Sequence, residues 1–277
     1  MTILDPHLDP HQDPAAASSA ATESGRGGAA SAPAVRLAGV SKQFGSGPSA
    51  VLALDRVSLD VERGELLCIV GASGCGKSTF LNLVAGLDAP SAGAVDVQGR
   101  VALMFQEAAL LPWRTAAQNV ELALKLRKVS RAERRAQALE LLSLVRLQDF
   151  ADKRPHELSG GMRQRVALAR ALGQGADVLL MDEPFGALDA ITRDVLHDEV
   201  ERVAAEQQLT TIFVTHNVRE AARLGDRIVL LSSRPGRVAA EFGVPVERPR
   251  RIESPEVSSI AGDVTVRLRE EMRRHAG

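Results

Sequence analysis

An apolar run that leads directly into a glycine-rich loop constrains the fold of this chain more than any other feature. The run ELLCIV spans 65–70, and the loop GASGCGKST spans 71–79. Its spacing fits G-x-x-x-x-G-K-[ST] between a buried strand and a helix, which is the context that a phosphate-binding loop requires. The glycines let successive backbone N–H groups converge on phosphate oxygens. We therefore predict a nucleotide-binding α/β domain built on a mostly parallel sheet.

The residues of this loop have distinct predicted roles. Lys77 is expected to neutralise charge on the β- and γ-phosphates, and the hydroxyl of Ser78 is expected to ligate Mg²⁺. The other residues contribute mainly their backbone amides. The predicted nucleotide-binding residues of the loop are Gly71, Ala72, Ser73, Gly74, Cys75, Gly76, Lys77, Ser78 and Thr79.

A second buried strand ends in two carboxylates. The segment DVLLMDE at 177–183 places Asp182 and Glu183 at the strand's exit. Ligands of open α/β sheets bind at this end of the strands. Asp182 is therefore predicted to hold the magnesium, directly or through water, and Glu183 to polarise an attacking water as general base.

Alternating apolar and polar residues predict antiparallel strands near the beginning of the chain. The segments VRLAGVSKQF (35–44) and LDRVSLDVE (54–62) both alternate as half-buried strands do. AVDVQG (94–99) and VALMFQ (101–106) predict a further strand pair on either side of Gly99. These segments add an antiparallel portion to the parallel sheet.

Helical periodicity appears after these strands. It runs from Thr115 to about Leu147, with a capping box expected at Ser130–Glu133. Farther along, helices alternate with buried strands, which predicts a sheet covered on both faces. The predicted later elements are strands at 210–216 and 227–233, helices at 189–207 and 217–225, and one strand and a charged helix after Arg237.

Charge, cysteine content and hydropathy limit the classes of function. The 34 Lys and Arg residues balance 35 Asp and Glu residues, so no global basic field favours a nucleic-acid partner. Cys68 and Cys75 are expected to be free thiols in a reducing compartment, with Cys75 either inclined to thiolate beside Lys77 or simply a small side chain in a tight loop. No apolar run approaches the roughly 20 residues that cross a bilayer. We expect a cytoplasmic chain with a disordered tail at 1–33.

Six segments stand out when the chain is taken in order: the loop at 71–79, Gln106 after VALMF, LSGG at 158–161, VLLMDEP at 178–184, Asp189 in GALDA and His216 in FVTH. Together they resemble the motifs of the ATP-binding subunits of ABC transporters, and the resemblance extends from 35 to about 245. The resemblance implies a P-loop NTPase fold with a RecA-like sheet, an antiparallel β subdomain and an inserted helical subdomain. It places the ATPase domain at 34–245, with its core at 34–109 and 174–245, the helical subdomain at 110–173 and a helical extension at 246–277.

The resemblance also implies roles for individual residues. Glu183, His216 and Gln106 form the catalytic set, with His216 contacting the γ-phosphate and Gln106 sensing magnesium or the attacking water. The magnesium ligands are Ser78, Gln106 and Asp182. Phe44 takes the place of the adenine-stacking aromatic residue that is commonly tyrosine. Two copies pair head to tail, so the signature residues of one chain close over the partner's ATP. The signature set is Ser159, Gly160, Gly161 and Gln164, and Asp189 is the D-loop residue.

A loop after Gln106 carries the only tryptophan of the chain. Leu110, Leu111, Pro112 and Trp113 pack into the core in one interpretation, and in the other they receive a short helix of a membrane permease. A single cassette without a membrane segment favours an importer. Three sequence segments are similar to those of the nitrate, taurine and aliphatic-sulfonate group of importers: FQEAALLPWRTAAQNV, SSRPGRV and VPVERPR.

The resulting hypothesis is an ATPase that powers import of aliphatic sulfonates. Its expected partners are a second copy of itself, integral membrane permease subunits and, indirectly, an extracytoplasmic solute-binding protein, with no nucleic acid. It would lie on the cytoplasmic face of the cell membrane as a peripheral protein. The alternatives are the same role for taurine, nitrate or another small anion, and a non-transport ABC ATPase acting on DNA or ribosomes.

Overall fold

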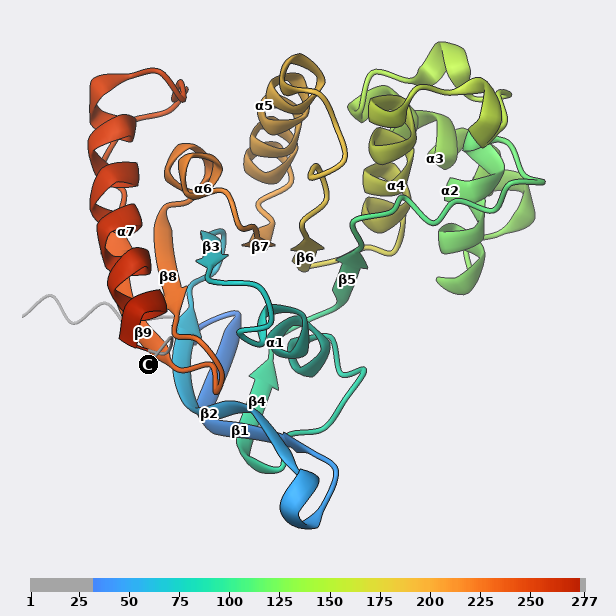
Figure 1. The fold of residues 1–277 in the computed structure, drawn as a ribbon. Helices are drawn as coiled ribbons and strands as arrows, with labels where there is room; N and C mark the ends of the chain where they lie inside the picture. Colours follow the sequence, from blue (N-terminus) through green and yellow to red (C-terminus); the bar gives the residue numbers. More distant parts are fainter. Residues whose placement is uncertain (1–31, 275–277) are drawn as a thin grey trace, which may run out of the picture. The chain divides into compact units, whose positions relative to one another are not determined.

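The computed structural model describes residues 32–274, so nearly all of the tail predicted at 1–33 lies outside the described residues. Two sheets and a group of helices make up the described part (Figure 1). The strands are β1 (Val35–Phe44), β2 (Val51–Val61), β3 (Leu66–Val70), β4 (Ala92–Val97), β5 (Val101–Met104), β6 (Val178–Asp182), β7 (Thr210–Val214), β8 (Arg227–Leu231) and β9 (Val238–Gly243). The α-helices are α1 (Lys77–Val84), α2 (Ala116–Leu126), α3 (Arg131–Leu144), α4 (Gly160–Gly173), α5 (Ala190–Glu206), α6 (Val218–Leu224) and α7 (Pro255–Arg274).

The larger sheet has six strands in the order β5-β6-β7-β3-β8-β9. All neighbouring pairs are parallel except β8 and β9, which are antiparallel. Side chains alternate between the two faces of each strand, as with Cys68 and Val70 on one face and Leu67 and Ile69 on the other. The continuous apolar runs predicted for these strands are explained by this burial on both faces.

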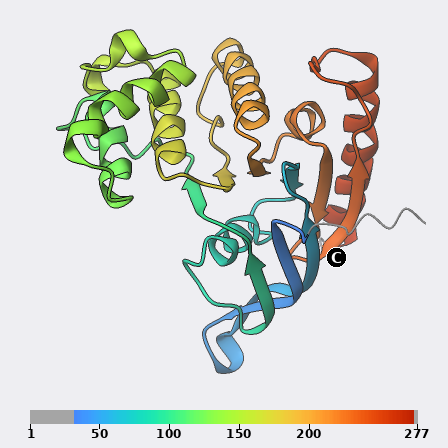
Figure 2. The same ribbon diagram turned by 180° about the vertical axis from the view of Figure 1, so that it is seen from behind.

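Different layers cover the two faces of the larger sheet. Helices α4, α5, α6 and α7 pack on one face, and α1 with the smaller sheet lies on the other (Figure 1). The view from behind shows the α2 to α4 lobe beside one edge strand, β5, and α7 beside the other, β9 (Figure 2). The predicted α/β class with an antiparallel portion is confirmed.

The smaller sheet is antiparallel, in the order β2-β1-β4, and it corrects one prediction. AVDVQG and VALMFQ are both strands, but they do not pair with each other. β4 pairs with β1, whereas β5 pairs with β6 in the other sheet. The chain changes sheets at Gly99, whose φ is 102° and whose Cβ would lie 2.4 Å from a carboxylate oxygen of Asp177. That carboxylate accepts the N–H of Arg100, which fixes the crossing.

Helices α2, α3 and α4 form a helical lobe between β5 and β6 in the sequence. The capping box predicted at Ser130 is only partly formed, because Glu133 interacts with the Ser130 hydroxyl rather than with its backbone N–H. A complete capping box begins α2 instead, between Thr115 and Gln118. Among residues 32–274, no helix is both long and apolar enough to cross a membrane.

Candidate active site

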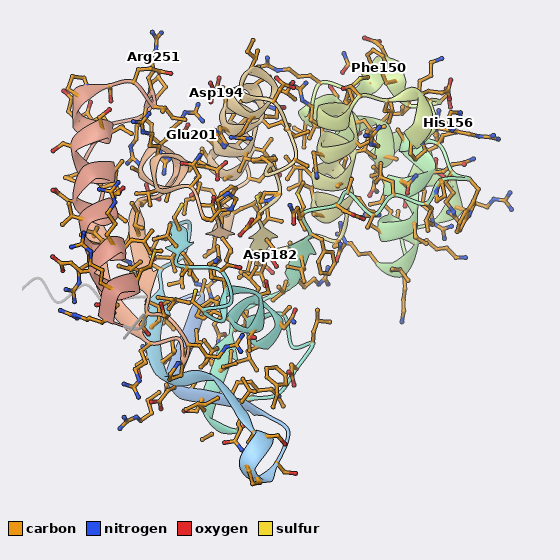
Figure 3. All side chains as sticks on the ribbon, viewed as in Figure 1. Phe150, His156, Asp182, Asp194, Glu201 and Arg251 are labelled. Atoms are coloured by element: carbon orange, nitrogen blue, oxygen red, sulfur yellow. The ribbon has the colours of Figure 1, made fainter. Side chains whose placement is uncertain are left out.

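A cavity of about 400 Å³ opens where the glycine-rich loop meets the ends of β6 and β7. It brings together residues that are far apart in the sequence: the loop and the start of α1, two residues that follow β6 and β7, and apolar residues of the smaller sheet. The lining residues are Phe44, Val51, Ala53, Ser73, Gly74, Gly76, Lys77, Ser78, Thr79, Glu183, His216 and Arg234. A larger cavity, of about 630 Å³, lies elsewhere, between α5 and segment 248–253, near Asp194 and Arg251 (Figure 3).

The glycine-rich loop has the shape of a phosphate cradle. Gly76 has a φ of 103°, and a Cβ at this position would lie 2.8 Å from Leu54 and 2.9 Å from the carbonyl of Ala53. A Cβ on Gly71 would lie 2.6 Å from the sulfur of Cys75. A larger residue at either position would push the loop out of this conformation. The loop therefore requires glycine here, as a loop whose amides surround a phosphate does.

Lys77 is held at the base of the loop. Its side chain is buried at 8% exposure, and its ammonium donates to the carbonyls of Gly71 at 2.9 Å and Ala72 at 3.1 Å. A buried ammonium needs such acceptors. Because both acceptors are neutral, the positive charge is not cancelled by a carboxylate there, and it suits an anionic ligand.

Glu183 and His216 meet at one wall of the cavity, just after the neighbouring strands β6 and β7. His216 Nδ1 lies 2.8 Å from a carboxylate oxygen of Glu183. Glu183 has a φ of 45°, in the left-handed region that a non-glycine residue rarely adopts, and its N–H donates to the carbonyl of Val214. This strained backbone turns the carboxylate out of the strand, and strain of this kind clusters at functional sites.

The residues predicted to bind magnesium carry donor atoms that suit this ion. Asp182 ends β6 (Figure 3), and Ser78 lines the cavity. Gln106 lies beside Gly186, close behind Glu183: its amide nitrogen would be 3.3 Å from a Cβ added to that glycine. Magnesium prefers oxygen ligands and is usually bound by one or two carboxylates together with substrate phosphates and water. Within 32–274 no group of three His, Cys, Asp or Glu side chains is placed to hold a metal alone. The carboxylate of Asp182 and the hydroxyl of Ser78 are oxygen donors of the kind that this ion prefers.

Phe44 lies at the mouth of the cavity. Its side chain is 45% exposed, and the ammonium of Lys42 lies 5.0 Å from the ring centroid. Val51 and Ala53 line the same end. An exposed aromatic ring beside an open cavity can stack on a planar base.

The signature residues lie apart from this cavity. Ser159 is exposed and caps α4, where its hydroxyl accepts the N–H of Met162 at 3.2 Å. Gly160 lines a separate cavity that also contains Gln106. Gly161 is buried against Thr192 of α5, whose methyl would lie 2.4 Å from a Cβ. Within one chain these residues therefore do not complete the site around Lys77.

Gln164, the fourth predicted signature residue, is hydrogen-bonded within its own chain. Its side chain is buried at 6% exposure, and its amide donates to the backbone carbonyl of Gln106 at 2.7 Å. The amide nitrogen is therefore bonded to the segment that follows β5, while no described residue hydrogen-bonds the buried amide oxygen.

Asp189 begins α5 as its N-cap. A carboxylate oxygen accepts the N–H of Thr192 at 2.9 Å, and this hydrogen bond holds the pKa of the carboxyl below its usual value. The side chain is therefore ionised at neutral pH and stabilises the helix start.

Cys75 is a buried thiol. Burial raises the pKa of its thiol, and the nearby Lys77 ammonium offsets only part of that effect. The small-side-chain interpretation of Cys75 is favoured over the thiolate.

The structure also places Arg234 at the cavity, and the sequence interpretation did not assign it to the site. Its guanidinium lines the cavity and donates one long hydrogen bond, 3.4 Å, to the carbonyl of Gly74. The hairpin that carries it is fixed by Gly236, whose N–H donates to Ala53 and whose Cβ would overlap the carbonyl of Cys75. The segment SSRPGRV was noticeable in the sequence, but nothing local indicated that it folds over the loop.

The tryptophan loop is exposed at its tip. Trp113 is 68% exposed, so the core-packing interpretation is wrong for this residue, whereas Leu110 does pack against the core. Leu110 and Leu111 are half-buried, and Pro112 is exposed. Arg170 of α4 fixes the beginning of this segment by donating to the carbonyls of Ala108 and Ala109.

Comparison with known families and proteins agrees with this geometry. A family described as ABC transporter matches residues 54–186. An aliphatic sulfonates import ATP-binding protein of Burkholderia lata is 49% identical over 230 residues, which cover 81% of this chain and 68% of that protein. A taurine import ATP-binding protein of Rhizobium johnstonii is 46% identical, over 80% of this chain and 88% of that protein. A bicarbonate transport ATP-binding protein of Synechocystis is 43% identical, over 80% of this chain and 36% of that protein.

Solved structures show the same fold. An ATP-binding cassette, solved as a dimer in a post-hydrolysis state bound to ADP and Pi, superposes with a TM-score of 0.68 at 35% identity. The match covers 77% of this chain and 100% of that one. The described residues of this chain therefore have the cassette fold, with one mostly parallel sheet and one antiparallel sheet.

Proposed function

The chain belongs to the ATP-binding subunits of ABC transporters, and from this membership we propose the roles of its residues, its partners and its solute. Its activity is ATP hydrolysis coupled to import. The observation that carries the assignment of the site is the single cavity that joins the glycine-rich loop, Glu183 and His216. An ATPase needs a phosphate cradle and a base together at one place.

The proposed nucleotide position follows from the cavity. Adenine stacks on Phe44, and the phosphates extend along the loop toward Lys77. Lys77 exchanges one or both of its carbonyl acceptors for phosphate oxygens, which carry a full charge and form the stronger hydrogen bonds. Arg234 adds a second cation at the rim of the same cavity.

The proposed chemical roles fall to Glu183 and His216. Glu183 accepts a proton from the water that attacks the γ-phosphate, while His216, held 2.8 Å from that carboxylate, orients it and reaches the γ-phosphate. Magnesium supplies charge neutralisation at the β- and γ-oxygens when it is bound. Ser78, Gln106 and Asp182 are the residues proposed to hold it, and their oxygens suit that ion.

A second copy of the chain is proposed to complete each site. The related cassette forms a dimer, and Ser159 with Gly160 opens a helix whose N-terminal amides can receive an anion. Since these residues lie outside the cavity of their own chain, the anion they suit is the γ-phosphate bound by the other chain.

The permease is proposed to bind at Leu110, Leu111, Pro112 and Trp113. An exposed tryptophan on a loop that also contains Gln106 gives the membrane partner a direct connection to the nucleotide site. Binding at this loop puts the chain on the cytoplasmic face of the membrane as a peripheral subunit. Through the permease, the ATPase acts with an extracytoplasmic solute-binding protein.

The proposed solute is an aliphatic sulfonate. Support comes from the relative at 49% identity that is named for this import, while the relatives named for taurine and bicarbonate leave other small anions as alternatives. The test is growth of the host on one sulfur or nitrogen source at a time after deletion of this gene. Loss of growth on alkanesulfonates, restored by the wild type and not by Lys77→Ala, supports the proposal. Loss confined to taurine or to nitrate supports the corresponding alternative.

A pull-down distinguishes transport from the non-transport alternative. The wild-type chain should retain a membrane permease from detergent-solubilised membranes. Retention on DNA or ribosomes without a permease would contradict the transport function.

A further inference from the structure

A buried series of hydrogen-bonded side chains lies directly behind Glu183 and His216. His197 of α5 is fully buried, and its Nε2 lies 2.6 Å from one carboxylate oxygen of Glu220 in α6. The other oxygen of Glu220 accepts the hydroxyl of Thr215, the residue before His216. None of these three residues belongs to the site described above.

Thr215 is fixed from several directions. Its backbone N–H donates to the carbonyl of Ile69 at 3.1 Å, in the strand that leads into the glycine-rich loop. Its hydroxyl oxygen accepts the N–H of Asn217 at 3.0 Å while the hydroxyl proton goes to Glu220. The turn that carries His216 is thus held on both sides of that residue.

The opposite side of His197 contacts the segment that follows Glu183. The His197 ring packs edge-on against Phe185, with ring centroids 5.5 Å apart. One turn earlier on α5, Arg193 donates to the carbonyls of Phe185 at 3.2 Å and Leu188 at 2.6 Å. His197 therefore lies between the segment after Glu183 and the network that holds His216.

Hydrogen bonds and nearby charges in this network stabilise the ionised form of Glu220. Burial alone would raise the pKa of the Glu220 carboxyl, but hydrogen bonds from His197 and Thr215, with the charges of His197 and Arg193, bring the pKa below its usual value. Asp194, on α5 in Figure 3, lies 3.7 Å from Nδ1 of His197, and no described residue hydrogen-bonds that nitrogen. An ionised Glu220 at 5% exposure depends on these donors.

We propose that His197 and Glu220 are positioning residues that set the location of His216 relative to Glu183. The inference rests on the roles proposed for Glu183 and His216. Neither positioning residue lines the nucleotide cavity, and neither contacts Lys77 or the glycine-rich loop. Their loss should therefore lower kcat for ATP hydrolysis and leave ATP affinity nearly unchanged.

Two sets of variants separate positioning from stability. In His197→Phe the ring contact with Phe185 is kept, but Glu220 loses its donor, so both the melting temperature and kcat should fall. In His197→Phe with Glu220→Met the buried charge is also removed, and replacing a buried ion pair with apolar side chains often restores stability. The melting temperature should recover while kcat stays low, because Glu220→Met removes the acceptor of the Thr215 hydroxyl.

Thr215→Val also tests positioning, with a smaller change: it removes only the hydroxyl that donates to Glu220. Valine has nearly the shape of threonine and leaves the His197 and Glu220 pair in place. We expect kcat to fall by roughly tenfold or more, since small displacements of reacting groups have effects of this size. The conservative His197→Gln, whose amide can donate to Glu220, should retain most of the wild-type kcat.

The readouts are kcat, ATP affinity by fluorescent-nucleotide titration, melting temperature and the imidazole NMR signals of His216, assigned with His216→Ala. The His216 signals should shift in Thr215→Val and in the double variant without nucleotide, and remain near wild type in His197→Gln. Recovery of kcat together with melting temperature in the double variant, or full kcat and unshifted signals in Thr215→Val, would overturn the positioning role. A wild-type chain that neither binds nor hydrolyses ATP contradicts the proposed function instead, and the NMR comparison still tests the positioning.

Discussion

Gln164, in the helix that begins with the signature glycines, donates its amide to the backbone carbonyl of Gln106 at 2.7 Å. Arg170 of the same helix holds the carbonyls of Ala108 and Ala109 at 2.8 Å and 2.7 Å. The helix start proposed to approach the partner's ATP is therefore bonded to the segment that leads to Trp113. Movement of α4 when two copies close should carry that segment with it, which would connect ATP binding mechanically to the loop proposed to bind the permease.

Replacing Glu183 with glutamine should preserve ATP binding and abolish most hydrolysis. The amide keeps the shape of the side chain but does not accept a proton from water, and loss of a general base typically costs about 10²–10⁴-fold in rate. ATP-stabilised dimers should accumulate, which size-exclusion chromatography detects. Glu140→Gln, an exposed change on α3, is the matched control. Turnover at the wild-type rate in Glu183→Gln would remove this residue from the role of base.

Arg234→Ala should weaken ATP binding modestly. The side chain is exposed, so screening by solvent limits its contribution, and we expect an increase in Kd of roughly two- to fivefold. The effect should shrink in high salt and be larger for ATP than for adenosine. Arg237→Ala on the same hairpin is the control, because Arg237 pairs with Asp55 and does not line the cavity. Equal effects of the two changes would indicate a role in the hairpin alone.

The glycine-rich loop and the carboxylates after β6 could be predicted because their signals are local. A strand, a loop and a helix that follow one another in the chain carry the phosphate cradle of Gly71 to Lys77. Asp182 ends an apolar strand and Glu183 follows it directly, so their place at the sheet edge follows from the strand direction.

Contacts between distant segments could not be predicted in the same way. Arg234 is 160 residues from Gly74, and periodicity around SSRPGRV does not indicate which loop it will cover. The separation of β4 and β5 into two sheets depends on the twist at Gly99, which short alternating patterns do not encode. The hydrogen bond from Gln164 to the Gln106 carbonyl is another contact between distant segments that the helix pattern alone does not indicate.

Trp113→Ala should leave the isolated chain as stable as the wild type and weaken its binding to the permease. The side chain is 68% exposed, so little core packing is lost, whereas an aromatic anchor in an interface contributes about 2 kcal/mol or more. Thermal denaturation of the isolated chain and permease pull-down from membranes provide the two measurements. Leu126→Ala, an exposed apolar change at the end of α2, is the control. A large drop in melting temperature with Trp113→Ala would contradict the docking role.

Acid should weaken the fold through Glu220. The pKa of this carboxyl is lower in the folded chain than its usual value of 4.5, with His197, Thr215 and Arg193 stabilising the charged form and Cys68 nearby as a neutral thiol. A carboxyl whose pKa is lower in the folded chain than in the unfolded chain stabilises the fold at pH values above its unfolded pKa. This stabilisation is lost as the pH falls through its folded pKa. Wild type should melt higher than Glu220→Gln at pH 7, and the difference should narrow below about pH 4.5. A difference that stays constant down to pH 3 would contradict this linkage.

Mixing two defective chains should restore an ATP site that neither forms alone. Lys77→Ala removes the phosphate-neutralising ammonium, and Ser159→Arg fills the anion-binding start of α4. If each ATP lies between Lys77 of one chain and Ser159 of the other, a heterodimer of the two variants carries both defects in one site and leaves the second intact. ATP-dependent dimerisation, and hydrolysis if one site suffices, should return.

The reciprocal heterodimer is the control for this prediction. Pairing wild type with a chain that carries both Lys77→Ala and Ser159→Arg leaves every shared site with one defect, so it should bind no ATP productively. If Ser159 instead served the nucleotide of its own chain, the outcomes would be reversed: the wild-type half would keep an intact site, and the two single variants together would have none. Heterodimers purified through two different affinity tags, with folding checked by circular dichroism, therefore distinguish the two arrangements by which pair regains ATP-dependent dimerisation.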